Sequence, residues 1–226
     1  MKTTHETTPY EEERRAMVEQ QIRRRGIRDE KVLEAMERVL RHEFVPAAQL
    51  GAAYDDRPLP IGDSETISQP YIVAAMTAAA RVELGDKILE IGTGSGYQAA
   101  ILAYLGGRVF TMERNFLLAE AARARLARLG YAGIEVIEGD GTEGYPVAAP
   151  YQVILVTAAS PEVPQPLLDQ LDEGGRMVIP VGNLWHQDLQ LLFKHAGQVV
   201  TRFLDPCQFV PLIGKFGWQE RGRPYH

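Results

Sequence analysis

The chain has 226 residues, of which 45% are hydrophobic and 24% are charged, and it carries a net charge of −6. This composition is typical of a globular protein and excludes a disordered chain. The negative balance argues against a nucleic-acid-binding protein that relies on a general positive field.

The distribution of apolar residues, cysteine and histidine indicates where the protein acts and which ligands it lacks. The longest largely apolar stretch, residues 71–80, is too short to span a bilayer, and residues 1–6 hold no apolar signal segment. The single cysteine, Cys207, cannot form an intramolecular disulfide and fits a reducing compartment. The five histidines do not fall at zinc-binding spacing. We therefore expect a cytoplasmic protein that binds no membrane, no nucleic acid and no metal.

The first third of the chain is predicted to hold three helices and one long loop. Asp29 is a good N-cap residue, and Ser68 or Gln69 can cap a helix that begins with proline. Two glycines and two prolines within residues 51–65 predict the loop. The predicted helices cover residues 10–25, about 30–40 and 70–81.

Strands and helices alternate from Lys87 onward, and this alternation predicts a doubly wound, Rossmann-like α/β sheet that is mostly parallel. Antiparallel strands are expected near the C-terminus. We expect residues 1–65 to form helices and a loop packed on a core made by residues 66–226. The predicted strands are 87–91, 108–112, 134–138, 152–157, 176–181, 189–194 and 199–204, and the helices between them are 98–105, 115–129 and 165–171.

A glycine-rich loop follows the first of these strands. Glycines at every second position allow the backbone to approach a ligand closely at a strand-to-helix turn. Their register differs from the dinucleotide fingerprint GxGxxG, and the GxGxG spacing resembles motif I of class I S-adenosylmethionine methyltransferases. A tight turn that binds nothing is the alternative. The candidate cofactor-binding residues here are Glu90, Gly92, Thr93, Gly94, Ser95 and Gly96.

Two acidic residues follow the next two strands. Glu113 ends the second strand, where an acid can accept both ribose hydroxyls of a nucleoside. Asp140, followed by Gly141, comes after the third strand, where methyltransferases commonly hold the adenine amine. Together with the glycine loop these positions predict a nucleoside cofactor. S-adenosyl-L-methionine, which would leave as S-adenosyl-L-homocysteine, suits a loop that has no phosphate-binding lysine.

The segment after the fourth strand bears on the methyl acceptor. Residues 157–161 do not match the [DN]PP[YFW] motif of amine methylation. Residues 206–208 spell the PCQ of cytosine C5 methyltransferases, but some fifty residues beyond the fourth strand. We interpret this match as coincidence and Cys207 as a core or strand residue.

The chain resembles the protein-L-isoaspartate (D-aspartate) O-methyltransferase family from about Met17 to Trp218. Residues 66–70, Thr-Ile-Ser-Gln-Pro, are more specific to this family than the glycine loop. The segments that carry the resemblance are 54–62, 66–71, 89–100, 139–141, 150–151, 156–159, 174–182 and 209–212.

The resemblance implies repair of age-damaged proteins and peptides. Such an enzyme methylates the α-carboxylate of L-isoaspartyl residues, with D-aspartyl residues as a second substrate left open, and the ester closes to a succinimide that opens partly to aspartate. Because a carboxylate is ionised at neutral pH, no general base is required. By the same resemblance Ser68 positions the carboxylate as the catalytic residue. We expect the enzyme to be a monomer or a weak homo-oligomer. The implied substrate-binding residues are Thr66, Ile67, Ser68, Val210, Pro211 and Leu212.

One position departs from the family pattern, which commonly has Gly-Gln before Thr-Ile-Ser where this chain has Ser64-Glu65. An extra carboxylate beside an anionic substrate would repel it, so we expect Glu65 to point away from the site or to pair with an arginine such as Arg57. Two other functions stay open: a class I methyltransferase for a small-molecule or RNA acceptor, and a protein that binds S-adenosylmethionine without turnover.

Overall fold

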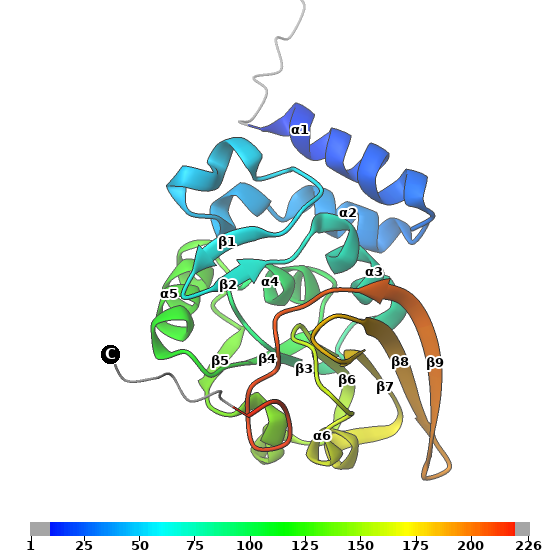
Figure 1. Ribbon diagram of the computed structural model, residues 1–226. Coiled ribbons are helices and arrows are strands. Elements are labelled where there is room, and N and C mark those ends of the chain that lie inside the picture. The colour runs from blue at the N-terminus through cyan, green and yellow to red at the C-terminus, as the bar shows by residue number, and fades with distance from the viewer. Residues whose placement is uncertain (1–9, 220–226) are drawn as a thin grey trace, which may run out of the picture.

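Seven strands form the central sheet of the computed structural model, which describes residues 10–219 (Figure 1). Their order is β5-β4-β3-β6-β7-β8-β9. The pairs from β5 to β7 are parallel, and β7, β8 and β9 pair antiparallel. The expected α/β sheet, mainly parallel with antiparallel strands at its C-terminal end, is confirmed. The strands are β3 Lys87–Ile91, β4 Arg108–Glu113, β5 Glu135–Glu138, β6 Tyr151–Val156, β7 Leu171–Gly182, β8 Gln187–His195 and β9 Gln198–Cys207.

Strands β3 and β6 lie at the centre of the sheet, and their buried residues are apolar except for Glu90 in β3. Ile88 pairs with Val153 and Ile91 with Val156, and all four side chains are buried. Parallel strands covered by helices on both faces need such continuous apolar runs. The helices around the sheet are α3 Pro70–Ala80, α4 Tyr97–Tyr104, α5 Phe116–Arg128 and α6 Gln165–Gln170.

Side chains cap the first turns of two helices, and one of them, Asp29, was predicted as a cap. Asp29 accepts hydrogen bonds from the backbone N–H groups of Lys31 and Val32 at the start of α2, Glu30–Arg38. Asn115 caps α5 in the same way, and its carboxamide oxygen lies 2.9 Å from the Leu117 nitrogen. These caps satisfy backbone donors that have no partner within the helix.

The predicted helix over residues 10–25 is helical but not one α-helix. It consists of α1, Glu11–Ala16, a π-helical segment, Met17–Ile22, and a 3₁₀ turn, Arg23–Arg25. Met17, Val18 and Ile22 are buried in the π-helical segment. The charge pattern could not reveal this, because the wider turns accompany packing against α3 and α2 rather than a local signal.

The predicted loop over residues 51–65 is wrong in its second part, because residues 59–65 belong to a β-hairpin. After 3₁₀ turns at Arg41–Phe44 and Ala47–Ala52, strands β1, Leu59–Gly62, and β2, Glu65–Ile67, pair antiparallel. Asp63 and Ser64 both have positive φ, 50° and 62°, as a two-residue hairpin turn requires. Leu59 and Ile67 face each other and are buried, so their burial outweighs the glycine and proline signals.

The N-terminal helices share one core with the sheet. Buried side chains of residues 17–59 continue into those of α3, α4 and one face of β3 and β6. In Figure 1 these helices, in blue, lie above the hairpin, in cyan, which in turn lies over the strand ends. The N-terminal part of the chain therefore covers these strand ends.

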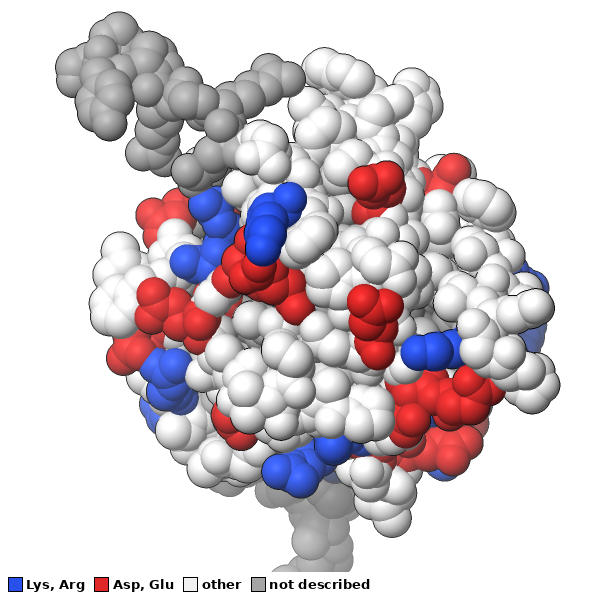
Figure 2. All heavy atoms as spheres, turned by 90° about the horizontal axis from the view of Figure 1, so that it is seen from below, with Lys and Arg blue, Asp and Glu red and all other residues white. Residues whose placement is uncertain are grey.

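Acidic and basic side chains lie close together on the face shown in Figure 2, and no continuous positive surface forms there. None of the helices within residues 10–219 combines the length and apolarity needed to cross a membrane.

Candidate active site

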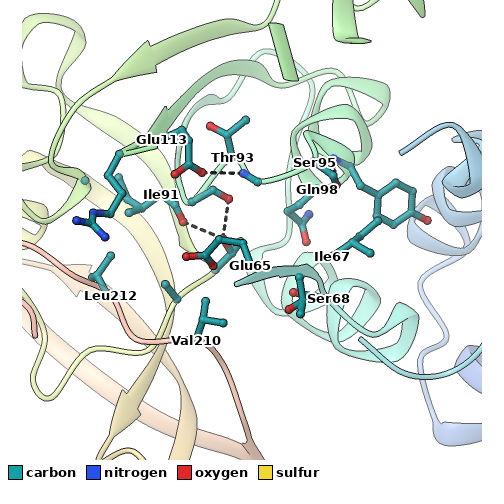
Figure 3. Close-up of a pocket in the computed structure, with 18 of the residues that line it drawn as sticks. Glu65, Ile67, Ser68, Ile91, Thr93, Ser95, Gln98, Glu113, Val210 and Leu212 are labelled. Carbon is teal, nitrogen blue, oxygen red and sulfur yellow. Dashed lines mark hydrogen bonds between the residues drawn. The ribbon is translucent and has the colours of Figure 1, made fainter. Parts of the chain in front are cut away.

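A pocket lies at the carboxyl ends of β3 and β6, beneath the hairpin (Figure 3). The chain runs from β3 toward β5 on one side of this point and from β6 toward β9 on the other, and such switch points are where open α/β sheets bind ligands. The pocket offers about 870 Å³ of free space, including its open mouth. The residues that line it are 65–68, 73, 76, 91–95, 97–98, 113–114, 141, 157–158 and 210–213.

The glycine loop is shaped by glycine-specific backbone angles and close packing. Gly92, Gly94 and Gly96 have φ of 95°, 51° and 85°. A side chain at Gly92 would collide with the hydroxyl of Thr157. That hydroxyl lies 2.9 Å from the carbonyl oxygen of Ile91 and 2.7 Å from that of Gly92, so it fixes the start of the loop. The structure brings Thr93, Gly94 and Ser95 to the pocket, with Gly96 at the N-cap of α4 behind them.

Glu113 ends β4 and faces the pocket beside the glycine loop. One carboxylate oxygen accepts the N–H of Gly94 at 2.9 Å, and the other accepts the N–H of Asn115 at 3.0 Å. A carboxylate has about four acceptor sites, so Glu113 keeps capacity for hydroxyl donors of a ligand.

Glu90, a candidate cofactor ligand in the sequence, does not line the pocket. It is fully buried, and the hydroxyl of Thr111 donates to one of its oxygens at 2.5 Å. The same hydroxyl lies 2.7 Å from that of Thr93 in the glycine loop. Burial raises the pKa of Glu90 to about 8, so this carboxyl is protonated at neutral pH. Side chains alternate along a strand, and the next residue, Ile91, faces the pocket instead.

Asp140 lies in a cavity that adjoins the pocket and shares Arg114 and Ile213 with it. Its carboxylate accepts hydrogen bonds from the N–H and hydroxyl of Thr142 and from the N–H of Lys215. Burial acts to raise the pKa of Asp140, but these hydrogen bonds outweigh it and the pKa is lowered. Its neighbour Gly141 lines the pocket itself.

Ser68 follows β2 at the boundary between the pocket and a second groove on its outer side. It is not the helix cap, because α3 has Gln69 at its N-cap and no capping side-chain hydrogen bond. The Gln69 amide donates instead to the carbonyl oxygen of Asp56 at 3.0 Å. Within residues 10–219 the Ser68 side chain makes no hydrogen bond, so its hydroxyl is available to a ligand. Thr66 and Ile67 line the same pocket.

The C-terminal segment brings the other candidate substrate residues opposite Ser68. Ala159 donates its N–H to Val210 and accepts the N–H of Leu212, both at 2.8 Å, so residues 210–212 run parallel to the end of β6. Val210, Pro211 and Leu212 all line the pocket, with Leu212 buried. The segments that contain Ser68 and Val210 are about 140 residues apart in the sequence, and both line this pocket.

Three residues from distant segments contact one another along the outer groove. The Arg25 guanidinium lies 3.4 Å from the centre of the Tyr71 ring, and the Tyr71 hydroxyl donates to Asp205 at 3.3 Å. Cys207 also lines this groove, and burial raises the pKa of its thiol to about 12. A thiol that stays protonated is a poor nucleophile, which agrees with a structural role for Cys207.

Glu65 does not behave as expected. Arg57 pairs with Asp55 at 3.1 Å rather than with Glu65, and the Glu65 side chain lines the pocket. The reason is the alternation of β2, which puts Glu65 on the same face as the buried Ile67. Burial, and next the negative charge of Glu113, raise the pKa of Glu65.

Several lining residues were not identified as candidates from the sequence, among them Arg114, Thr157, Tyr97 and Gln98. Thr157 is the last residue of the predicted strand 152–157, and its place at a strand end could have indicated it. No group of three or more His, Cys, Asp or Glu side chains that could hold a metal ion occurs in the described part of the chain.

Comparisons with a family model and with individual relatives point to the same family. Residues 12–217 match the family protein-L-isoaspartate(D-aspartate) O-methyltransferase. A protein-L-isoaspartate O-methyltransferase of Methanoculleus marisnigri is 58% identical over 97% of this chain and 100% of its own length. One of Methanoregula boonei is 55% identical over 94% of this chain and 99% of its own.

Solved structures agree in fold. A protein-L-isoaspartate O-methyltransferase structure has a TM-score of 0.81 and 30% identity, covering 90% of this chain and 67% of that one. A Plasmodium falciparum structure in complex with S-adenosyl-L-homocysteine shares the fold, with a TM-score of 0.78, 24% identity, and coverage of 88% of this chain and 98% of that one.

Proposed function

Since the chain belongs to the protein-L-isoaspartate(D-aspartate) O-methyltransferase family, we propose that it methylates the α-carboxylate of L-isoaspartyl residues in damaged proteins and peptides, with S-adenosyl-L-methionine as methyl donor. The ester formed then closes to a succinimide with loss of methanol, as the following backbone nitrogen attacks the ester carbonyl, and water opens the succinimide partly to normal aspartate. We expect the enzyme to act in the cytoplasm as a monomer or a weak homo-oligomer, which gel filtration over a range of concentrations can test.

The pocket fits this cofactor in its donor and acceptor groups. Glu113 offers free acceptor sites for ribose hydroxyls, and the backbone of Gly92 and Gly94 is open to close approach. The charged lining residues are Glu65, Glu113 and Arg114, which suits a ligand without phosphates. When bound, S-adenosyl-L-methionine supplies a methyl group activated by a sulfonium sulfur. Asp140 and Gly141 would lie toward its adenine end.

Ser68 is the residue that we assign to the substrate carboxylate. Its hydroxyl has no partner within the described chain and borders both the pocket and the outer groove, and this observation carries the proposal. A hydroxyl there can donate a hydrogen bond to the carboxylate and hold it toward the methyl group. The carboxylate is already ionised, so positioning and removal of water are the tasks left to the protein.

The outer groove is the place we propose for the peptide main chain. Val210 and Leu212 both direct backbone groups toward Ala159, so the carbonyl of Pro211, which lies between them, points to the other side of the segment and can accept a peptide N–H. Main-chain pairing of this kind binds peptides with little dependence on their side chains. An enzyme for damage that arises in many sequences needs such tolerance.

The test compares two peptides that differ only in isoaspartate against aspartate. Label from methyl-labelled S-adenosyl-L-methionine should appear as a base-labile ester on the isoaspartyl peptide alone. Label on neither peptide, with cofactor binding intact by calorimetry, would contradict the proposed acceptor and favour a small-molecule or RNA acceptor.

Ser68→Ala tests the positioning role. A hydrogen bond to a charged group contributes about 1.5–3 kcal/mol, so kcat/KM should fall by roughly tenfold to a hundredfold. The melting temperature should not change, because Ser68 does not cap α3. Ser68→Thr keeps a hydroxyl and should recover part of the activity. Full activity in Ser68→Ala would refute this role.

A further inference from the structure

The Glu65 carboxylate occupies a position inside the pocket that the proposed function does not use. Figure 3 shows its side chain extending from β2 into the pocket, between Ser68 and the residues Ile91 and Glu113. Glu65 lines this pocket but not the outer groove, whereas Thr66 and Ser68 line both. Glu65 therefore faces the proposed cofactor compartment rather than the proposed peptide groove.

The charges around Glu65 come from two elements. Glu113, at the end of β4, raises the Glu65 pKa through its negative charge, and Arg114, which follows β4, lowers it. Asp63, on the hairpin turn, adds a smaller repulsion and accepts a hydrogen bond from the Asn115 side chain at 3.1 Å. Two carboxylates, Glu65 and Glu113, thus line the pocket with one guanidinium, that of Arg114.

The two ligands of this pocket differ in one charge. S-adenosyl-L-methionine carries a positive sulfonium, and the product S-adenosyl-L-homocysteine carries a neutral thioether at the same atom. A carboxylate attracts the positive sulfonium but not the neutral thioether. In a partly desolvated pocket this attraction is only weakly screened by solvent. We propose that Glu65 is a specificity-determining residue that makes the pocket prefer the sulfonium cofactor over its thioether product. This inference rests on the proposed function, and its consequence is that the spent cofactor leaves more readily.

Calorimetry with the two ligands tests the proposal directly. The ratio of the Kd for S-adenosyl-L-homocysteine to that for S-adenosyl-L-methionine should fall about tenfold in Glu65→Gln, mainly because the sulfonium ligand binds more weakly. Asp63→Asn is the matched control, since it removes one negative charge from the same hairpin at an exposed side chain. Its ratio should stay within twofold of the wild-type value, because solvent screens exposed charges.

A charge-conserving variant and pH provide independent readouts. Glu65→Asp keeps the carboxylate and should keep most of the preference for the sulfonium ligand. This variant therefore tests the role of the charge independently of any disturbance of the hairpin in Glu65→Gln. In the wild type the ratio should fall as pH is lowered through the raised pKa of Glu65 and the carboxylate takes up a proton, and it should change less in Glu65→Gln.

The outcomes separate this inference from the proposed function. Equal changes in both Kd values, or an unchanged ratio, would overturn the role of Glu65 while leaving the methyltransferase in place. A tenfold gain in peptide affinity with an unchanged ratio would also overturn it, because Glu65 would then face the substrate carboxylate. If neither ligand binds the wild-type chain, the proposed function fails and the inference fails with it.

Discussion

Glu90 should make the protein less stable as pH rises, and replacing it by glutamine should remove this dependence. The carboxyl is fully buried, and only one of its two oxygens has a hydrogen-bond partner. Burial raises its pKa from the usual 4.5 to about 8. The folded protein therefore holds a proton that the unfolded chain gives up at lower pH.

The sign and size follow from proton linkage. Below pH 4.5 both states are protonated, and the group has no effect on the pH dependence of stability. From pH 4.5 to about 8 only the unfolded state ionises, so the free energy of unfolding falls with increasing pH. At about 1.4 kcal/mol for each pH unit, the interval from pH 5 to pH 7 corresponds to about 3 kcal/mol.

The assay is urea unfolding of the wild type and Glu90→Gln at pH 5, 6, 7 and 8. Other groups titrate in both proteins, so the quantity to follow is the difference between them. This difference should shift in favour of Glu90→Gln by about 3 kcal/mol from pH 5 to pH 7 and level off above pH 8. Glu162→Gln, at an exposed position, is the control and should show no such trend.

A constant difference between wild type and Glu90→Gln across this range would refute the reasoning. It would mean that Glu90 ionises in the folded protein as easily as in the unfolded chain. A constant offset alone would not support it, since the glutamine amide leaves a buried donor unpartnered at every pH.

Two further substitutions test the packing around the site. Gly92→Ala should weaken binding of S-adenosyl-L-methionine at least tenfold by calorimetry, because φ is 95° at Gly92 and a side chain would collide with Thr157; unchanged affinity would show that the loop tolerates a side chain. Arg41 is fully buried, its Nε donates to the Ala53 carbonyl at 2.8 Å, and its two terminal nitrogens have no partner. Arg41→Met should therefore change the free energy of unfolding by no more than about 1 kcal/mol, whereas Arg41→Ala should cost about 2–4 kcal/mol through the cavity it leaves. Similar losses in both variants, measured by urea unfolding, would show that the charge itself stabilises the fold.

Sequence patterns predicted the secondary structure correctly where the determining residues lie within one helix or strand. Alternating strands and helices from Lys87 onward predicted the sheet and its antiparallel end, and the strand predicted over 152–157 corresponds to β6. Asp29 was predicted as a cap from its residue type and position, and it does cap α2. Burial periodicity and capping depend on residues a few positions apart, so they can be read without knowing the rest of the chain.

The hairpin and the inner face of the pocket depended on contacts between distant segments. Strands β1 and β2 pair because Leu59 and Ile67 are buried in the core that includes the N-terminal helices. The pattern of residues 51–65 alone did not indicate this burial. The same pairing directs Glu65 into the pocket, contrary to expectation.

The amino-acid sequence by itself determined the family, the order of the elements and the residues that follow each strand. Only the tertiary structure decided which of these side chains face the pocket. Glu90 and Glu113 are both acids on central strands, yet one is buried against Thr111 and the other borders the pocket. The direction of a strand side chain depends on register and on what covers each face, and both are set by packing between segments far apart in the chain.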